Sequence, residues 1–242
     1  MLNVLISEFA KLRRSLVLLL CAAAPVLVAL LIALMFHQKE GPDQPWSFYL
    51  VGASAIWGFF MLPMAVTALT ILVAQLEHGP RFWNHLLALP VPRASFFAAK
   101  IAAVVLLVAA MTLALFALVP ELGWLADTTQ PARSLTGEVD LAQFGSILAR
   151  MFGGALLLVT VQLWAALRFR SFVPPLVLGI GGTFVAVVAT GSSWGPYFPW
   201  LIPTNQLASD PANAQLALTV GIVGGLVVAA AMLVDLSRRE IV

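Results

Sequence analysis

A Gly-x-Ser-x-Gly pattern at Gly191–Gly195 is the place where the sequence could carry a nucleophile. In hydrolases this pattern puts the serine, here Ser193, on a sharp turn between a strand and a helix. No strand-like segment precedes the pattern in this chain. The only histidine expected on the same side is His37, and loop residues Glu40 and Asp43 are the only carboxylates that could orient it. A hydrolase therefore remains only as the least favoured alternative.

The spacing of residues also predicts neither a metal-binding site nor a nucleotide-binding site. His78 and His85 are seven residues apart and flank a helix break, so they lack the i, i+4 spacing of a zinc-binding helix. The phosphate-binding pattern Gly-x-x-x-x-Gly-Lys-Ser/Thr occurs nowhere. The single cysteine, Cys21, lies in an apolar run. We expect no catalytic residue, no metal site and no cofactor in this chain, and we expect nucleotide chemistry only in a partner.

The composition excludes a water-soluble protein. Apolar residues make up 61% of the 242 residues, and only 24 residues carry charge, whereas soluble domains have about 45–50% apolar and about 25% charged residues. Six windows contain no Asp, Glu, Lys or Arg: residues 15–38, 44–76, 101–120, 151–167, 171–209 and 211–234. Such a distribution is required by a hydrocarbon slab about 30 Å thick.

The charge-free windows predict an all-α polytopic membrane protein with one transmembrane domain over residues 1–242. We expect six transmembrane helices, at about 15–36, 48–76, 96–119, 148–167, 172–190 and 212–236.

Individual residues predict kinks, ends and close contacts of these spans. Pro63 predicts a kink in the second span, and Pro120 marks the expected end of the third. Lys100, one turn into the third span, is expected to snorkel to the interface. Gly221 and Gly225 favour close packing within the chain. Residues 191–203 contain three prolines, while Trp194, Tyr197 and Trp200 suit the headgroup zone, so the segment is expected to be an interfacial or partly re-entrant element packed on the bundle.

Lysine and arginine predict the orientation. Residues 1–14, 77–100, 168–171 and 237–242 carry ten of them, and the alternate side carries three. Positive residues accumulate on the cytoplasmic side. We therefore predict an N-in/C-in arrangement, with the loop between the second and third spans in the cytoplasm.

Two amphipathic helices are expected on that side. Leu2, Leu5, Ile6, Phe9 and Leu12 form one face of residues 1–14, which predicts a helix in the membrane plane; the other interpretation is a straight extension of the first span. Residues 80–89 form a second short helix, begun by Pro80 and ended by Pro90. A helix this short needs a partner to be stable. We expect a cytosolic protein to bind it; the other interpretation is that it rests on the bilayer.

These features resemble the ABC-2 type permeases. The resemblance rests on the N-terminal amphipathic helix, the six spans and a loop of the form Glu77-x-Gly79-x-x-x-Trp83-x-x-Leu86-x-x-x-Pro90-Val91-x-Arg93, followed by Phe97-x-x-Lys100. The likeness is greatest to the branch of lantibiotic-immunity and bacitracin-type exporters. It implies that residues 1–14 are the elbow helix and that residues 80–89 are a coupling helix docked on a separate ATPase. The implied ATPase-coupling residues are Glu77, Gly79, Arg81, Phe82, Trp83, Asn84, His85 and Leu86.

Together these observations predict a permease subunit of an ATP-driven exporter in the cytoplasmic (inner) membrane, not an enzyme. Its expected partners are two cytosolic ABC ATPase subunits that bind ATP and Mg, a second permease copy or paralogue, and membrane lipid, but no nucleic acid. The alternatives are a non-transporting membrane scaffold or assembly subunit and, less favoured, an intramembrane hydrolase.

The expected cargo is amphiphilic, peptide or lipid-like. The spans contain no deep ionisable residue of the kind that an ion-coupled carrier uses. The candidate substrate-pathway residues are Phe59, Phe60, Met61, Met64 and Gln162, although packing within the bundle explains each of them singly.

Overall fold

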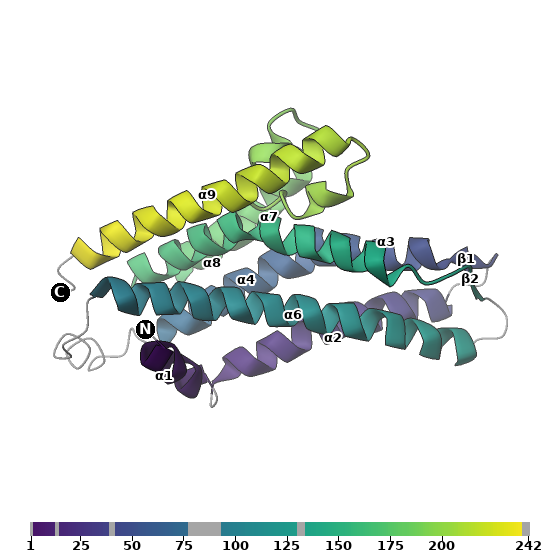
Figure 1. The fold of residues 1–242 in the computed structure, drawn as a ribbon, viewed down its shortest axis with the longest axis horizontal. Helices are drawn as coiled ribbons and strands as arrows, with labels where there is room; N and C mark the ends of the chain where they lie inside the picture. Colours follow the sequence, from purple (N-terminus) through teal and green to yellow (C-terminus); the bar gives the residue numbers. More distant parts are fainter. Residues whose placement is uncertain (1, 13–14, 39–41, 77–92, 130–133, 239–242) are drawn as a thin grey trace.

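The computed structural model describes residues 2–12, 15–38, 42–76, 93–129 and 134–238. Long helices run side by side along one axis, as Figure 1 shows. Within the described residues, five helical segments are long and apolar enough to cross a membrane: Leu16–His37, Trp46–Gln75, Ala94–Thr129, Leu141–Arg168 and Pro211–Arg238. The prediction of an all-helical multi-pass membrane protein is thereby confirmed, whereas six crossings and their orientation stay predictions.

The second span is built from three consecutive helical elements, and each of the other long helices is a single element. In order the elements are α1 (Leu2–Leu12), α2 (Leu16–Gln38), β1 (Gln44–Pro45), α3 (Trp46–Ile56), the π-helix η1 (Trp57–Met61), α4 (Leu62–Gln75), α6 (Arg93–Thr129), β2 (Leu135–Thr136), α7 (Leu141–Arg168), α8 (Val173–Ala189), the 3-10 helices η2 (Gly195–Tyr197) and η3 (Thr204–Leu207), and α9 (Pro211–Arg238). At 17 residues, α8 is the shortest of the apolar helices that follow α6.

Glycines bring α7 and α9 into close contact. A Cβ atom on Gly221 would lie 2.6 Å from the Cα of Gly154, and one on Gly225 would lie 2.9 Å from the backbone of Leu156. Small residues at such crossings let two backbones approach in a membrane, where the hydrophobic effect does not drive helices together. The predicted use of the Gly221 and Gly225 pair for packing within the chain is confirmed.

A π-helix interrupts the second span. The backbone N–H of Leu62 donates to the carbonyl of Trp57, five residues earlier, and Pro63 follows directly. Proline has no N–H and its ring displaces the carbonyl four residues before it. The wider turn accommodates that displacement, as single π-turns do inside α-helices. The irregularity predicted at Pro63 therefore lies in the turn just before it.

Pro120 does not end the third span, so this prediction was wrong. Helix α6 continues through Pro120 to Thr129. Packing holds the continuation, because a Cβ atom on Gly123 would lie 2.7 Å from the ring of Trp46, and Trp46 packs edge-on against Trp124 with centroids 5.9 Å apart. Neighbouring helices commonly let membrane helices tolerate proline.

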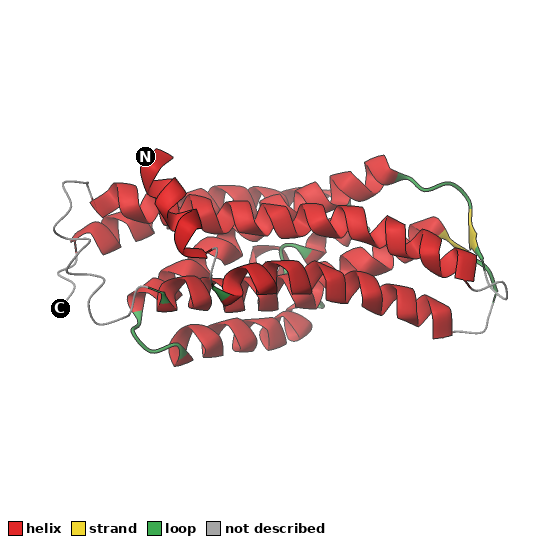
Figure 2. Ribbon diagram, turned by 90° about the horizontal axis from the view of Figure 1, so that it is seen from below, coloured by secondary structure: helices red, strands yellow, loops and turns green. Residues whose placement is uncertain are grey.

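A small parallel sheet, absent from the sequence-based prediction, joins two connections at one end of the bundle. Gln44 of β1 pairs with Leu135 of β2. Two carboxylates fix this contact, since Asp43 accepts from the N–H of Ser134 at 2.8 Å and Asp127 accepts from the N–H of Leu135 at 2.6 Å. Figure 2 shows the strands at the end opposite the two termini.

The segment between α8 and α9 packs on the bundle, as expected. Trp200 is only 4% exposed and lies against Gly182, and Ile202 packs on Gly154. The placement of Trp200 in the headgroup zone was therefore wrong, because its ring fills the space that a side chain at Gly182 would need. Trp194 and Tyr197 are exposed.

The contact between α4 and α8 should fail if a single methyl group is added at Gly179. A Cβ atom there would lie 2.1 Å from Oγ1 of the buried Thr67. Overpacking of this kind costs about 1–3 kcal/mol. We expect Gly179→Ala to lower the apparent melting temperature of the purified protein in a thermal-shift assay. Gly181→Ala, two residues along, is the matched control, because nothing lies within 4 Å of a Cβ atom there. Equal melting temperatures for the two variants would contradict the packing.

Candidate functional site

The predicted ATPase-coupling residues, from Glu77 to Leu86, lie outside the described residues. The structure does describe the helices on either side of this segment. Gln75, the last residue of α4, and Arg93, the first of α6, lie at the same end of the bundle as α1 and the C-terminal end of α9 (Figure 1). The segment 77–92 therefore connects two helices whose ends share one end of the bundle.

An ion-pair cluster joins α1 to the start of α6 at this end. One carboxylate oxygen of Glu8 accepts from Lys100 Nζ at 2.7 Å, and the other accepts from Lys11 Nζ at 2.5 Å. Both ammonium groups also lie over the ring of Phe96, 5.1 and 5.2 Å from its centroid. Glu8 is 3% exposed and Lys100 1%. The cluster therefore fastens α1 to α6 through buried charges.

The electrostatics of the cluster keep Glu8 ionised. Burial by itself raises the pKa of the Glu8 carboxyl, but the charges and hydrogen bonds of Lys100 and then Lys11 outweigh it and hold the pKa below its ordinary value. A carboxylate in contact with two ammonium groups is favoured over the neutral acid. Glu8 is thus an anion that both lysines contact.

The sequence-based prediction missed this cluster and misplaced Lys100. Lys100 was expected to snorkel to the interface, whereas it is buried beneath α1 and paired. On the apolar face of α1, Leu12 is buried in the protein and Ile6 is exposed, so contact of this face with the acyl boundary stays a prediction. Glu8 was the available signal, because it lies in the same i, i+3, i+4 stripe as Leu5, Phe9 and Leu12. A carboxylate in an apolar stripe needs a cation.

The predicted pathway residues fall on the second span and on α7. Phe59, Phe60 and Met61 belong to η1, and Met64 lies one turn into α4. Phe60 is 53% exposed, and the other three are half-buried. Helix α8 packs beside both η1 and α4. The structure therefore gathers these four residues on one stretch of the second span, next to α8.

Gln162 lies apart from solvent, between α7 and α8. Its Nε2 donates to the carbonyl oxygen of Pro175 at 2.6 Å, while its Oε1, fully buried, has no hydrogen-bond partner among the described residues. A buried amide oxygen left unpaired costs free energy. Gln162 is thus a half-satisfied polar contact at the α7–α8 interface.

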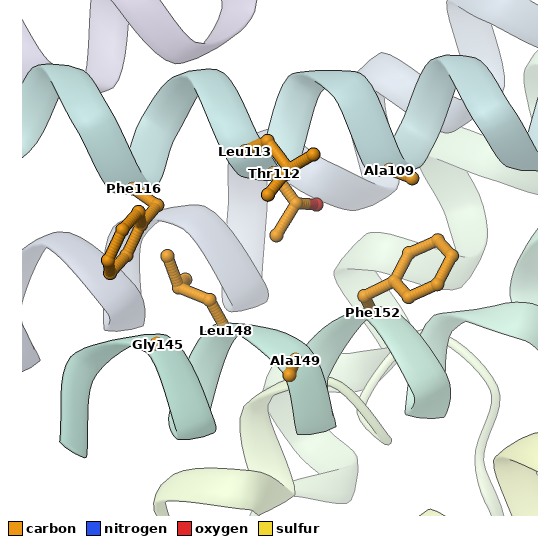
Figure 3. Close-up of a pocket in the computed structure, with 8 residues that line it drawn as sticks. All are labelled: Ala109, Thr112, Leu113, Phe116, Gly145, Leu148, Ala149 and Phe152. Carbon is orange, nitrogen blue, oxygen red and sulfur yellow. The ribbon is translucent and has the colours of Figure 1, made fainter. Parts of the chain in front are cut away.

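A separate apolar pocket of about 320 Å³ opens between α6 and α7, as Figure 3 shows. The small residues Ala109, Gly145 and Ala149 leave space between the rings of Phe116 and Phe152. The pocket's one hydroxyl, on Thr112, donates to its own helix at the carbonyl of Val108 and so offers no free donor. None of the predicted pathway residues lines this pocket.

Comparison with known proteins decides the family. A family model described as ABC-2 family transporter protein matches residues 4–186, which is most of the chain and includes the cluster around Glu8 and most of α1 and α8. The chain belongs to this family. It is therefore a membrane permease of the ABC-2 type, as the resemblance implied. Neither the curated proteins nor the solved structures give a match.

Family membership implies a partner protein for this permease. ABC-2 permeases work with an ABC ATPase. The family match covers the chain from within α1 to within the last turn of α8, whereas α9 and the residues just before it lie beyond the match. The cluster around Glu8 is thus part of the family's own domain.

Replacing Glu8 should loosen α1 in the permease. In Glu8→Gln the Lys100 ammonium stays buried without its carboxylate, and breaking a buried pair costs about 3–5 kcal/mol. We expect faster amide hydrogen exchange throughout α1 and a lower melting temperature. Glu121→Gln, at an exposed carboxylate further along α6, is the control and should change neither. Unchanged exchange in α1 after Glu8→Gln would disprove the anchoring role.

Acid should weaken the stabilisation of α1 by Glu8. The folded protein lowers the pKa of Glu8, so the pair stabilises α1 fully above the ordinary carboxyl pKa of about 4.3. This stabilisation is lost as the pH falls through the lowered pKa. Protection of α1 from exchange, corrected for the intrinsic pH dependence of amide exchange, should therefore fall only at acid pH in the unsubstituted permease. In Glu8→Gln this protection should be weak at all pH values and lack the transition.

Proposed function

We propose that this chain is the membrane-spanning permease subunit of an ATP-driven exporter that moves an amphiphilic, peptide or lipid-like substrate. Two cytosolic ABC ATPase subunits would power it, and a second permease copy or paralogue would complete the pathway. The observation that carries the proposal is the buried Glu8–Lys100 pair. This pair connects α1 to the helix that begins directly after the predicted coupling segment.

The charge distribution supports placing the Glu8 end in the cytoplasm. Ten of the thirteen lysines and arginines fall in the segments at this end, and positive residues favour the cytoplasmic side. Six crossings with both termini inside follow if α8, with the packed segment after it, completes a hairpin with α9. The proposed location is the cytoplasmic (inner) membrane.

Force from the ATPase would enter through residues 80–89. Arg93 begins α6 directly after this segment, and Lys100 lies two turns further along. Because Lys100 is paired with Glu8, a push on the start of α6 would move α1 with it. The two helices would move together, and the long α6 would tilt across its whole length in the membrane. Packed helices commonly shift between two arrangements in this way.

The exposed side of α8 supports a second permease copy. Val177, Phe184 and Val188 are 63%, 70% and 76% exposed on a helix that packs beside η1 and α4. Phe60 of η1 is exposed as well. We place the substrate pathway between two copies at this side, lined by Phe60 with Phe59, Met61 and Met64, and with Gln162 behind α8.

The proposal assigns no catalytic step to this chain. ATP and Mg would be bound by the ATPase partners, because the sequence lacks a phosphate-binding pattern. The residues from Glu77 to Lys100 support a place beside the lantibiotic-immunity and bacitracin-type branch. An apolar pathway suits amphiphilic molecules of the kind that this branch exports.

Trp83→Asp should abolish binding of the ATPase while leaving the permease folded. A carboxylate in place of an aromatic anchor would introduce a buried, unpaired charge at the docking surface, and such central aromatic residues commonly contribute 2 kcal/mol or more to binding. We expect the ATPase to be lost on co-purification, and ATP hydrolysis by the complex with it.

The matched control is Trp194→Asp, which replaces an exposed tryptophan in the segment between α8 and α9. That variant should retain the ATPase. If Trp83→Asp keeps both the ATPase and vanadate-sensitive export, the coupling assignment is wrong. Full export activity without any ATPase would overturn the whole proposal.

A further inference from the structure

An open groove lies between α7 and α9 at the end of the bundle that carries both described termini. Its volume is about 690 Å³. Trp164 of α7 forms one wall, Ala230, Ala231 and Val234 of α9 form the other, and Arg238 lies at its mouth. The two helices run side by side toward this end (Figure 1). The groove therefore has an apolar interior and a charged mouth.

The charges at the mouth leave a net positive site. Asp235 accepts at one oxygen from Arg168 Nη1 at 2.8 Å and from Trp164 Nε1 at 2.9 Å. Arg168 thus offsets the charge of Asp235, and Asp235 holds the indole of Trp164. Arg238 is exposed, and among the described residues its side chain has no ion-pair partner. The Arg238 guanidinium is therefore available to an anion.

An exposed apolar stripe on α9 leads from the membrane interior to this guanidinium. Val223, Val227, Ala230, Val234 and Arg238 are spaced by three or four residues, so they share one helical face, and all five are exposed. The fifteen steps from Val223 to Arg238 rise about 22 Å at 1.5 Å per residue. This length matches one leaflet, about half of a 40–45 Å bilayer with its headgroups.

We infer that this groove binds one anionic phospholipid. Its phosphate would lie against Arg238, with Arg168 nearby, and one acyl chain would follow Ala231, Val234 and the stripe toward Val223. Trp164 suits the boundary between headgroup and chain. Basic residues between helices at a membrane surface attract anionic headgroups. A zwitterionic lipid would lack the net charge, and a soluble anion would leave the apolar stripe unused.

Native mass spectrometry of the purified full-length permease tests this inference. The protein is titrated in detergent with phosphatidylglycerol and, separately, with phosphatidylcholine. We expect phosphatidylglycerol to bind more tightly. Arg238→Gln should weaken its binding about five-fold, since one basic residue contributes on the order of 1 kcal/mol, and should leave phosphatidylcholine unchanged. Ala231→Trp should fill the groove and weaken both lipids.

Arg150→Gln is the matched control, because Arg150 is an exposed arginine on α7 whose guanidinium contacts Gln215, near the start of α9 and away from the groove. It should leave phosphatidylglycerol binding unchanged. Equal affinity for the two lipids, an equal loss in Arg150→Gln, or no effect of Ala231→Trp would each overturn the site. Displacement of phosphatidylglycerol by millimolar inorganic phosphate would overturn it in favour of a soluble anion. The inference does not require the ATPase, so it stands or falls separately from the exporter role.

Discussion

The buried lysine at the start of α6 constrains the end of the bundle on which the proposed coupling depends. An ammonium group that is 1% exposed needs a counter-ion, because taking an unpaired charge out of water costs several kcal/mol. Glu8 is that counter-ion, and it reaches Lys100 only if α1 lies across the start of α6. One electrostatic requirement therefore favours this position of α1.

The geometry of the cluster also explains why α1 is not simply a membrane-surface helix. Lys11 and Lys100 approach the same carboxylate from two helices and share the ring of Phe96. The lowered pKa of Glu8 keeps the carboxylate charged across the neutral range, so the fastening does not depend on small changes of pH. A helix held in this way transmits displacement better than one held only by lipid.

Elsewhere in the bundle, helices contact each other closely at glycines. Gly221 and Gly225 let α9 lie directly on α7, while Gly179 lets α8 lie on Thr67 of α4. Such contacts are tight but small in area, and α8 leaves a large apolar side uncovered. Helix α8 on α4 and helix α9 on α7 thus each combine a tight contact on one side with an uncovered apolar side.

The sequence by itself determined the class of protein and the positions of its apolar helices. Hydrocarbon excludes charge wherever a helix crosses it, and five of the six charge-free windows lie in long helices. The window 171–209 holds the shorter α8 and the packed segment after it. The same reasoning predicted the packing of Gly221 and Gly225, because only small residues permit that approach. The resemblance carried by Glu77–Lys100 agrees with the family found by comparison. The roles of Trp83 and its neighbours stay predictions.

Only the tertiary structure decided what depends on contacts between distant residues. Lys100 is buried rather than snorkelling because α1, ninety residues earlier, covers it. Helix α6 passes through Pro120 because Trp46 and Trp124 hold the turns beyond it. Trp200 leaves the surface because Gly182 makes room for its ring. Local sequence specifies which segments can be helical, but a proline, a lysine or a tryptophan takes its final environment from whatever the fold packs against it.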